Sequence, residues 1–292
     1  MPAEPFTPNG QTRLYGVLGH PVQTSLSPAM QNAGFRALGL NALYVAFPVL
    51  PERLAAAVAG LSAAGVAGFN LTVPHKLAIL PLLDVITPEA EAIGAVNTVR
   101  CEPAPGGIRL IGTNTDGAGF LRSLDMDLRF DPRGKQVLLL GAGGAARGIA
   151  HALLGAGTGK LWIANRTRTR ARGLADALKT RFPQAEIEGI GLKETGGLGP
   201  HLLVNATTVG MGDGSSPVRL ANIGVREAVV DIVYHPAETP LLREAESLGV
   251  ACTNGIGMLL YQGCAAFEFW TFQRAPEGPM RQALLAALRE RR

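Results

Sequence analysis

Polar side chains that can bind or protonate a small molecule recur through the first third of the chain, at expected strand ends and helix starts. They are Ser25, Ser27, Asn70, Thr72, Lys76, Asn97, Thr98 and Asn114-Thr115-Asp116. Together they offer hydroxyls, amides, one cation and one carboxylate. That set suits a small polyhydroxylated acid better than an apolar ligand or a nucleic acid. Each residue also has an ordinary structural explanation, since Ser27 and Asp116 can cap helices and Lys76 can be a surface residue.

A glycine-rich turn follows the apolar segment 136–140 and reads Gly141-Ala142-Gly143-Gly144-Ala145-Ala146. In a strand–turn–helix unit, Gly141 permits the tight turn and Gly143 lets a pyrophosphate approach the backbone. The small Ala146 allows close packing of helix on strand. The N–H groups and dipole of the helix N-terminus then favour an anion. The pattern predicts a dinucleotide site, although an ordinary strand-to-helix turn has a similar composition.

The next expected strand, 160–164, indicates which dinucleotide is bound. An NAD site needs an acidic residue about 20 residues after the glycine turn to bind the ribose. The chain instead has Asn165-Arg166-Thr167, followed by Arg168, Thr169 and Arg170. A guanidinium complements a 2′-phosphate, and cations at a helix N-terminus are unfavourable unless they bind an anion. The residues therefore predict NADP rather than NAD.

The elements that would position these residues alternate between strand-length apolar runs and helix-length segments, which favours an α/β fold. Ser27 is expected to cap the first helix, with Pro28 at its first position. From Gly255 onward the chain reads as helical, in two pieces broken at Pro276 and Pro279. The expected strands are 13–19, 43–48, 67–73, 95–101, 108–113, 136–140, 160–164, 202–206 and 228–233, and the other expected helices are 27–38, 51–64, 116–128, 145–154 and 168–182.

Composition excludes several classes of protein. The chain has 292 residues, of which 47% are hydrophobic, so intrinsic disorder is not expected. No apolar run reaches the roughly 18–20 residues of a membrane span, and the first residues do not resemble a signal peptide. The three cysteines, Cys101, Cys252 and Cys264, lack CxxC spacing, and the five histidines form no HExxH pair. We expect a reduced, cytoplasmic protein without a metal and without a membrane partner.

The charge pattern does not favour nucleic acid. Lys and Arg number 27 against 23 Asp and Glu, which gives a net charge of +4 and a sequence pI near 9.2. The positive charge is diffuse apart from 166–172 and the last four residues. Aromatic residues are only 5% of the chain, so no basic strip with interleaved aromatic residues is present.

Eight ordered segments resemble the shikimate dehydrogenase family. The segments are Ser25-Leu26-Ser27-Pro28, Asn70-Leu71-Thr72-Val73-Pro74-His75-Lys76, Gly94-Ala95-Val96-Asn97-Thr98, Asn114-Thr115-Asp116-Gly117, Gly141-Ala142-Gly143-Gly144-Ala145, Asn165-Arg166-Thr167, Asn205-Ala206-Thr207 and Gly255-Ile256-Gly257-Met258-Leu259 with Gln262. The resemblance covers the whole chain.

The resemblance implies NADPH-dependent, reversible reduction of 3-dehydroshikimate to shikimate, in the pathway to chorismate and the aromatic amino acids. It also implies two domains. An N-terminal α/β substrate domain, 1–115, would be completed by returning C-terminal helices, 255–292. A Rossmann-type, doubly wound NADP-binding domain, 116–254, would be inserted between them.

The resemblance also implies roles by position. Ser25 and Ser27 would bind the substrate carboxylate, and Lys76 would be the acid/base with Asp116 beside it. Substrate hydroxyls and carbonyl would meet Thr72, Asn97, Asp116 and Gln262, with Tyr234 near the substrate; Gly141–Ala145 and Asn165–Arg170 would bind NADP, with Ile232 and Gly255 near the nicotinamide. A core amide bonded to backbone is an alternative explanation for Gln262.

Other functions remain as alternatives. Thr24 stands where many members have histidine, and the Leu26 spacer also occurs in quinate/shikimate dehydrogenases with relaxed substrate or cofactor choice. Glutamyl-tRNA reductase has a similar glycine turn, but Cys101 lacks the motif of its catalytic cysteine. A non-catalytic NADP sensor is disfavoured because Lys76 and Asp116 are both present. The sequence leaves the oligomeric state open, with a homodimer as one option.

Overall fold

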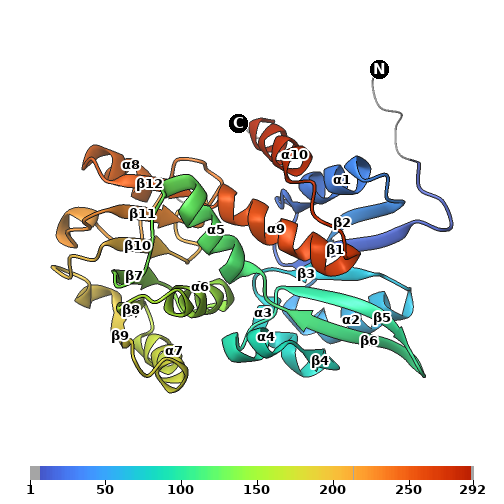
Figure 1. Ribbon diagram of the computed structural model, residues 1–292, viewed down its shortest axis with the longest axis horizontal. Coiled ribbons are helices and arrows are strands. Elements are labelled where there is room, and N and C mark those ends of the chain that lie inside the picture. Colours follow the sequence, from blue (N-terminus) through green and yellow to red (C-terminus); the bar gives the residue numbers. More distant parts are fainter. Residues whose placement is uncertain (1–6, 213, 291–292) are drawn as a thin grey trace. The chain divides into compact units, whose positions relative to one another are not determined.

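The computed structural model describes residues 7–212 and 214–290, and within them the chain forms two compact units (Figure 1). Unit 1 contains the described residues up to Thr115 and those from Gln262 onward, and unit 2 is Asp116–Tyr261. The sequence predicts that the chain returns to the N-terminal domain at residue 255. The division instead falls inside helix α9 (Ile256–Thr271), because Met258 in the first turn of that helix packs into the core of unit 2.

Unit 1 is built on a mixed sheet of six strands among its described residues, in the order β2-β1-β3-β5-β6-β4. The strands are β1 (Arg13–Gly19), β2 (Ala42–Pro48), β3 (Gly68–Leu71), β4 (Val85–Ile86), β5 (Thr98–Ala104) and β6 (Gly107–Thr113). Strand β1 pairs in parallel with β2 and β3, whereas β5 is antiparallel to β3 and β6. The parallel part therefore ends its strands at one edge, where Thr72 directly follows β3.

Helices cover both faces of this sheet. Successive strand residues point to opposite sides, and apolar side chains are buried on both. Phe69 and Leu71 of β3 pack on one side with Leu54 and Val58. On the other side Tyr15, Phe35 and Trp270 form an aromatic cluster, with ring centroids 5.1 and 5.3 Å apart. The helical elements of unit 1 besides α9 are α1 (Ser27–Ala37), η1 (Pro51–Arg53), α2 (Leu54–Ala63), α3 (His75–Ala78), η2 (Leu80–Leu82), α4 (Pro88–Ile93) and α10 (Glu277–Arg289). The Trp270 indole donates to the Val99 carbonyl at 2.9 Å, which ties the end of α9 to β5.

Unit 2 is a parallel sheet whose described strands run in the order β12-β11-β10-β7-β8-β9. The strands are β7 (Gln136–Leu140), β8 (Lys160–Asn165), β9 (Glu186–Gly191), β10 (Leu202–Asn205), β11 (Ala228–Asp231) and β12 (Ala251–Asn254). This is the doubly wound order of a Rossmann fold, with the reversal of strand order between β7 and β10. The expected α/β fold with a Rossmann-type part is confirmed.

The strands of unit 2 are apolar on both faces because each face is covered by helices. Val137 and Leu139 of β7 point into a core shared with α5, α6 and α7, and Leu138 and Leu140 point into a second core shared with α8. The helical elements of unit 2 are α5 (Asp116–Leu128), α6 (Gly144–Gly155), α7 (Arg168–Arg181), η3 (Leu192–Glu194), η4 (Leu220–Asn222) and α8 (Pro240–Ser247).

Several local expectations differ from the structure. The strand expected at 95–101 is β5, Thr98–Ala104, so Asn97 lies just before it. Ser27 is the first residue of α1 rather than its cap, and the cap position is taken by Leu26, which makes no side-chain cap bond. The expected helix 51–64 begins as the separate 3-10 turn η1. Pro279 does not break a helix, because it lies in the first turn of α10, where proline is tolerated. The short elements β4, α4, β9, α8 and β12 were not expected from the sequence.

Candidate active site

Asn97 is at the centre of a buried polar network in unit 1. Its side chain is 1% exposed, and its Oδ1 accepts from the Thr115 N–H at 2.9 Å. Its Nδ2 donates to the Thr115 hydroxyl at 2.9 Å and to Gln262 Oε1 at 3.3 Å. Two of the residues predicted to bind substrate are therefore in direct contact, although they are 165 positions apart in the chain.

The network continues through Asn70, a polar candidate from the sequence without a specific role, and through Tyr44, which the sequence does not single out. Asn70 Nδ2 donates to the Asn97 carbonyl and the Thr98 hydroxyl, both at 3.0 Å, and Asn70 Oδ1 accepts from the Tyr44 hydroxyl at 2.7 Å. Burial raises the pKa of the Tyr44 hydroxyl well above its usual value, so the group stays protonated and can donate. Ser27 lies close enough to the same hydroxyl to oppose part of that rise in pKa.

The hydrogen-bonded residues thus run from Tyr44 to Gln262 through Asn70 and Asn97, with Ser27 beside Tyr44. A polar residue between two apolar ones in a strand, as Asn70 is between Phe69 and Leu71, was the available signal, since a buried amide needs partners. Tyr44 gave no comparable signal, because tyrosine is common in strands.

The two predicted serines lie at the start of α1 and contact each other. Ser25 Oγ accepts from the Ser27 N–H at 3.2 Å. Ser27 is buried, at 8% exposure, and Ser25 is half-buried. The pair therefore places two hydroxyls at one helix start.

Thr72 and Lys76 are positioned mainly by main-chain contacts. Thr72 donates its N–H to the Leu18 carbonyl at 2.9 Å and accepts from the His75 N–H at 2.9 Å. The Lys76 carbonyl accepts from the Val96 N–H at 2.9 Å. Both side chains are half-buried. These contacts place Lys76 next to the segment that carries Asn97.

His75, the neighbour of Lys76, is fully buried. Its Nε2 lies 2.8 Å from the Val49 carbonyl, and within the described residues its Nδ1 has no hydrogen-bond partner. Its ring therefore attaches α3 to the segment that follows β2.

The glycine turn of unit 2 fits a pyrophosphate. Gly141 has a φ of 115°, and a Cβ there would lie 3.0 Å from the Ala206 carbonyl oxygen, so only glycine suits the position. Helix α6 starts after Gly143 with no side-chain cap, which leaves its first N–H groups for an anion. The turn is therefore both tight and open to a ligand.

Three exposed arginines follow β8 and fit a 2′-phosphate. Arg166, Arg168 and Arg170 are all solvent-exposed. Arg168 is paired with Glu194, at 3.1 Å between Nη1 and Oε1. Asn165 Nδ2 donates to the Thr167 carbonyl at 3.0 Å and shapes the turn before α7.

Ile232 and Gly255, both predicted near the nicotinamide, are adjacent in unit 2. A Cβ at Gly255 would collide with the Ile232 carbonyl, and the Gly255 N–H donates to the Val233 carbonyl at 3.3 Å. Tyr234 is half-buried in the segment after β11, and Asp116, 2% exposed, is the first residue of α5. Both belong to unit 2.

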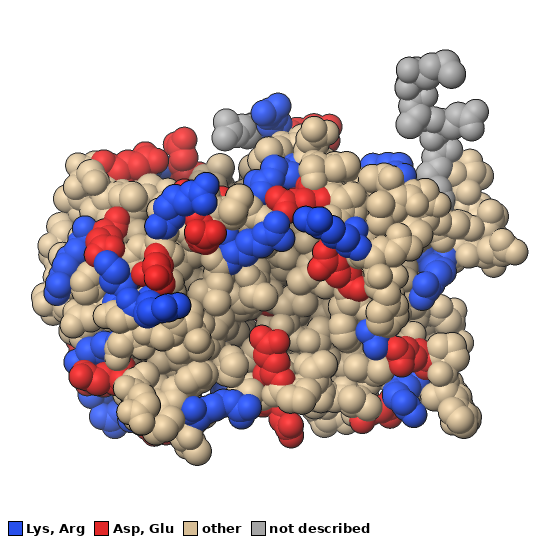
Figure 2. Space-filling view, viewed as in Figure 1, with Lys and Arg blue, Asp and Glu red and all other residues tan. Residues whose placement is uncertain are grey.

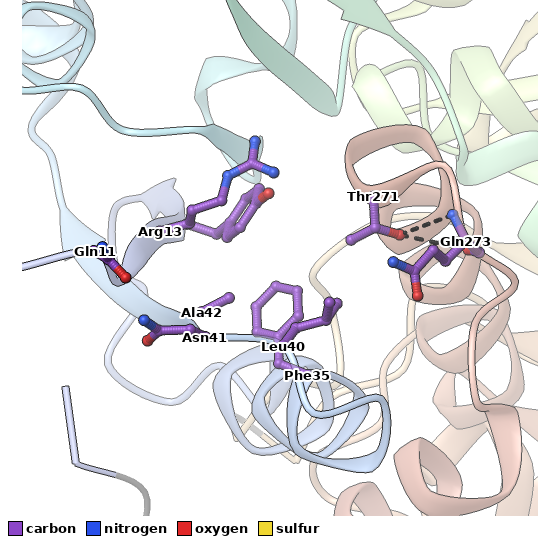
Figure 3. A pocket seen from close by; sticks show the side chains of 9 residues that line it. Gln11, Arg13, Phe35, Leu40, Asn41, Ala42, Thr271 and Gln273 are labelled. Atoms are coloured by element: carbon purple, nitrogen blue, oxygen red, sulfur yellow. Dashed lines mark hydrogen bonds between the residues drawn. The ribbon is translucent and has the colours of Figure 1, made fainter. Parts of the chain in front are cut away.

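Unit 1 also has a pocket of about 260 Å³ that none of the predicted site residues lines (Figure 3). Its walls are Gln11, Arg13, Tyr15, Phe35, Leu40, Asn41, Ala42, Thr271 and Gln273. The Thr271 hydroxyl accepts a hydrogen bond from the Gln273 N–H at 3.2 Å.

Surface charge, potential metal ligands and the length and hydropathy of helices are further features of the described part of the chain. Basic and acidic side chains are interspersed on the face shown in Figure 2. Among residues 7–212 and 214–290, no group of three or more His, Cys, Asp or Glu could bind a metal ion. In the same residues, no helix is long and apolar enough to cross a membrane.

Family models match three stretches of the chain. Residues 17–99 match the shikimate dehydrogenase substrate binding domain, and residues 126–192 match shikimate/quinate 5-dehydrogenase. Residues 255–285 match the shikimate 5′-dehydrogenase C-terminal domain.

Relatives match over nearly the full length. The shikimate dehydrogenase (NADP(+)) of Geobacter sp. strain M21 is 52% identical over 97% of this chain and 98% of its own. The crystal structure of shikimate 5-dehydrogenase from Thermus thermophilus, in complex with NADP(H) and shikimate, has a TM-score of 0.83 and 40% identity, covering 95% of this chain and 100% of that one. Quinate dehydrogenase from Corynebacterium glutamicum in complex with NAD has a TM-score of 0.84 and 30% identity, covering 94% and 99%.

Proposed function

The chain belongs to the shikimate dehydrogenase family, and we propose that it catalyses the reversible NADP-dependent oxidation of shikimate to 3-dehydroshikimate. The observation that carries the proposal is the contact of Asn97 with Gln262, within a hydrogen-bond network that reaches Tyr44 beside Ser27. That network presents hydroxyls and amides of the kind that a polyhydroxylated acid requires.

Substrate would be bound by its carboxylate and its hydroxyls. Ser25 and Ser27 would donate to the carboxylate, because two hydroxyls lie at one helix start, where an anion is favoured. Thr72, Asn97 and Gln262 would bind the hydroxyls, with Tyr234 near the ring. The hydrogen bonds that fix Asn97 make this part of the site preorganised, which supports selective binding.

Lys76 would be the acid/base. Reduction of the ketone builds negative charge on its oxygen, and a lysine ammonium neutralises that charge by giving up a proton. In the oxidation direction the neutral amine takes the proton from the substrate hydroxyl. Asp116 would orient the ammonium. It directly follows Thr115, whose N–H and hydroxyl are both bonded to Asn97.

The residues of unit 2 would hold NADP. The first N–H groups of α6 would bind the pyrophosphate, and Arg166 and Arg170, with Asn165, Thr167 and Thr169, would bind the 2′-phosphate. Arg168, which is paired with Glu194, would contribute less. Ala142, Gly144 and Ala145 would line the turn, and Ile232 and Gly255 would lie against the nicotinamide. When bound, NADPH supplies the hydride, and the protein supplies geometry and the proton.

A second candidate is a quinate/shikimate dehydrogenase with relaxed choice of acid or cofactor. The match to a quinate dehydrogenase over 94% of the chain is the observation that favours it. The exposed arginines after β8 support NADP, because they would leave NAD without its acidic ribose partner.

The test is an absorbance assay at the NADPH band, with shikimate and quinate each offered with NADP and NAD. We expect kcat/KM for shikimate with NADP to exceed that for quinate by at least about tenfold, or about 1.4 kcal/mol in the transition state. Comparable rates for the two acids would favour the second candidate. No oxidation of either acid would refute both.

We also propose that the protein works in the cytoplasm. None of the three cysteines, all within the described residues, forms a disulfide, which supports a reducing compartment, since disulfides form mainly in oxidising ones.

A further inference from the structure

Asp231 is a fully buried carboxylate that joins three segments of unit 2. Its Oδ1 accepts from Asn205 Nδ2 at 2.9 Å and from the Val233 N–H at 3.1 Å. Its Oδ2 accepts from the Thr239 hydroxyl at 2.7 Å. These donors come from the end of β10, the segment after β11 and the start of α8.

The first of these bonds shapes the segment after β10. Asn205 Nδ2 also donates to the Val209 carbonyl at 3.2 Å, and Asn205 Oδ1 accepts from both the N–H and the hydroxyl of Thr207, at 3.1 and 2.7 Å. Asp231 thus orients the amide that folds residues 206–209. That segment begins at Ala206, whose carbonyl lies against Gly141 of the glycine turn.

The other two bonds shape the segment after β11. The Val233 N–H fixes the turn that carries Ile232 and Tyr234, and the Ile232 carbonyl lies against Gly255. Thr239 closes the far end, because its hydroxyl also accepts from the Leu242 N–H at 3.3 Å and caps α8. One side chain therefore sets both segments.

The strand order indicates which part of a bound dinucleotide these segments would contact. Neighbouring strands run β8, β7, β10, β11. The arginines for the 2′-phosphate follow β8, and the glycine turn for the pyrophosphate follows β7. A dinucleotide laid along this edge of the sheet reaches the segments after β10 and β11 with its other end, the nicotinamide.

We propose that Asp231 is a positioning residue for the nicotinamide half of the cofactor site, setting segments 206–209 and 232–234 without touching the cofactor. The inference rests on the proposed function for its cofactor. A carboxylate suits this task because it only accepts, and so takes three donors from three segments at once. Burial raises the pKa of this carboxyl, and the three hydrogen bonds oppose that rise.

The experiment compares Asp231→Asn and Thr239→Val with two matched threonine variants. Asparagine keeps the shape but must turn its NH₂ toward one of the donors. Thr239→Ser retains the hydroxyl and both of its bonds. Thr195→Val removes another buried hydroxyl of unit 2, which donates to the Leu192 carbonyl at 2.8 Å and contacts neither segment. For each protein, kcat and KM for shikimate are measured with NADP, and dissociation constants are measured for NADPH and for 2′,5′-ADP, which lacks the nicotinamide half.

For Asp231→Asn we expect kcat to fall about 10- to 100-fold, the scale set by misplacing a reacting group by about an ångström. NADPH should bind more weakly, while 2′,5′-ADP should bind within about twofold of wild type. Thr239→Val should change kcat and NADPH affinity in the same direction by less, and Thr239→Ser and Thr195→Val should resemble wild type.

Two results would overturn the inference: an unchanged kcat in both Asp231→Asn and Thr239→Val, or equal losses of affinity for NADPH and 2′,5′-ADP, which would indicate a general folding role. If Asp231→Asn does not fold, Thr239→Val against Thr239→Ser decides the question by the same readouts. If the wild-type protein oxidises no shikimate, the proposed function fails, whereas the two affinities still decide whether Asp231 positions the nicotinamide half.

Discussion

At the scale of single residues, the candidate site separates side chains that react from side chains that position them. The Lys76 carbonyl accepts from the Val96 N–H, a main-chain bond that a substitution of the side chain retains. Asn97, in contrast, uses both ends of its amide to fix Thr115 and Gln262. Substitutions at the two positions should therefore have different consequences.

Lys76→Ala should remove the proton donor and leave the fold intact. We expect kcat to fall roughly 10²- to 10⁴-fold, the range of general acid–base catalysis, with a much smaller change in KM. The measurement is steady-state kinetics with shikimate and NADP, together with the dissociation constant for NADPH, which should not change because its residues belong to unit 2.

Asp116→Asn should also lower kcat, and the double variant should be less than additive, because a residue that only orients Lys76 contributes little once the lysine is absent. A Lys76→Ala enzyme with near-normal kcat would show that the proton comes from elsewhere. His75 is fully buried and bonded to Val49, so Tyr234 would then be the next candidate.

Arg166→Ala should weaken NADP binding more than Arg168→Ala does. Arg166 is available for a charge-assisted contact worth about 1.5–3 kcal/mol, whereas Arg168 is paired with Glu194. An exposed pair of this kind contributes only about 0–1 kcal/mol, so losing it has a small effect. Calorimetric titration of each variant with NADP and with NAD measures the loss of affinity for each cofactor. Equal losses for the two cofactors in Arg166→Ala would remove the argument for a 2′-phosphate contact.

At the scale of elements, the carboxyl edge of the unit 2 sheet depends on backbone approaches that admit no side chain. Gly255 joins β12 to α9 directly against the Ile232 carbonyl. The junction therefore sets the path of the segment after β11. Gly173, within α7, has no such role, because it has open space around it.

Gly255→Ala and Gly173→Ala should consequently change stability in opposite directions. Alanine at Gly255 forces the backbone apart and should destabilise by about 1–3 kcal/mol or more, with a loss of kcat. Alanine at Gly173 should stabilise by about 0.5–1 kcal/mol, because it favours the helix and meets no atom within 4 Å. Urea unfolding followed by circular dichroism measures both, and a neutral Gly255→Ala would contradict the close approach.

At the scale of the whole molecule, each unit has its own apolar core, and the buried charge of Asp231 lies within unit 2. Because burial raises the pKa of this carboxyl above its ordinary value of 3.8, the folded state binds its proton more tightly than the unfolded state does. Its contribution to stability is therefore complete below that ordinary value and is lost as pH rises through the raised pKa.

The stability of Asp231→Asn, measured as its unfolding free energy minus that of wild type, should therefore increase as pH rises from about 4 toward neutrality. Asparagine does not titrate, so the variant escapes that loss. Urea unfolding at several pH values measures the difference, with Thr195→Val as a non-titrating control that should follow the wild-type slope. A difference that is constant with pH, or that shrinks as pH rises, would contradict the raised pKa.

Much of the fold could be read from local sequence. The glycine turn, the apolar strands 136–140 and 160–164 and the helix start at Asp116 appear in the structure within about a residue, because turn chemistry and periodicity act over a few neighbouring positions. Short or exposed strands could not be predicted in this way. Strand β4 has two residues and β12 is half-exposed, so neither shows a periodicity that distinguishes a strand from a loop.

Local sequence established the functional groups: the family motifs, the alternation of strands and helices, and the arginines in place of an acidic residue after β8. Which polar groups contact one another depends on how the elements pack. Asn70 joins Tyr44 to Asn97, and Asp231 joins three segments, through hydrogen bonds between residues far apart in the chain. Such contacts leave no local pattern, because each side chain is ordinary in its own element and acquires its partner only when strands and helices pack.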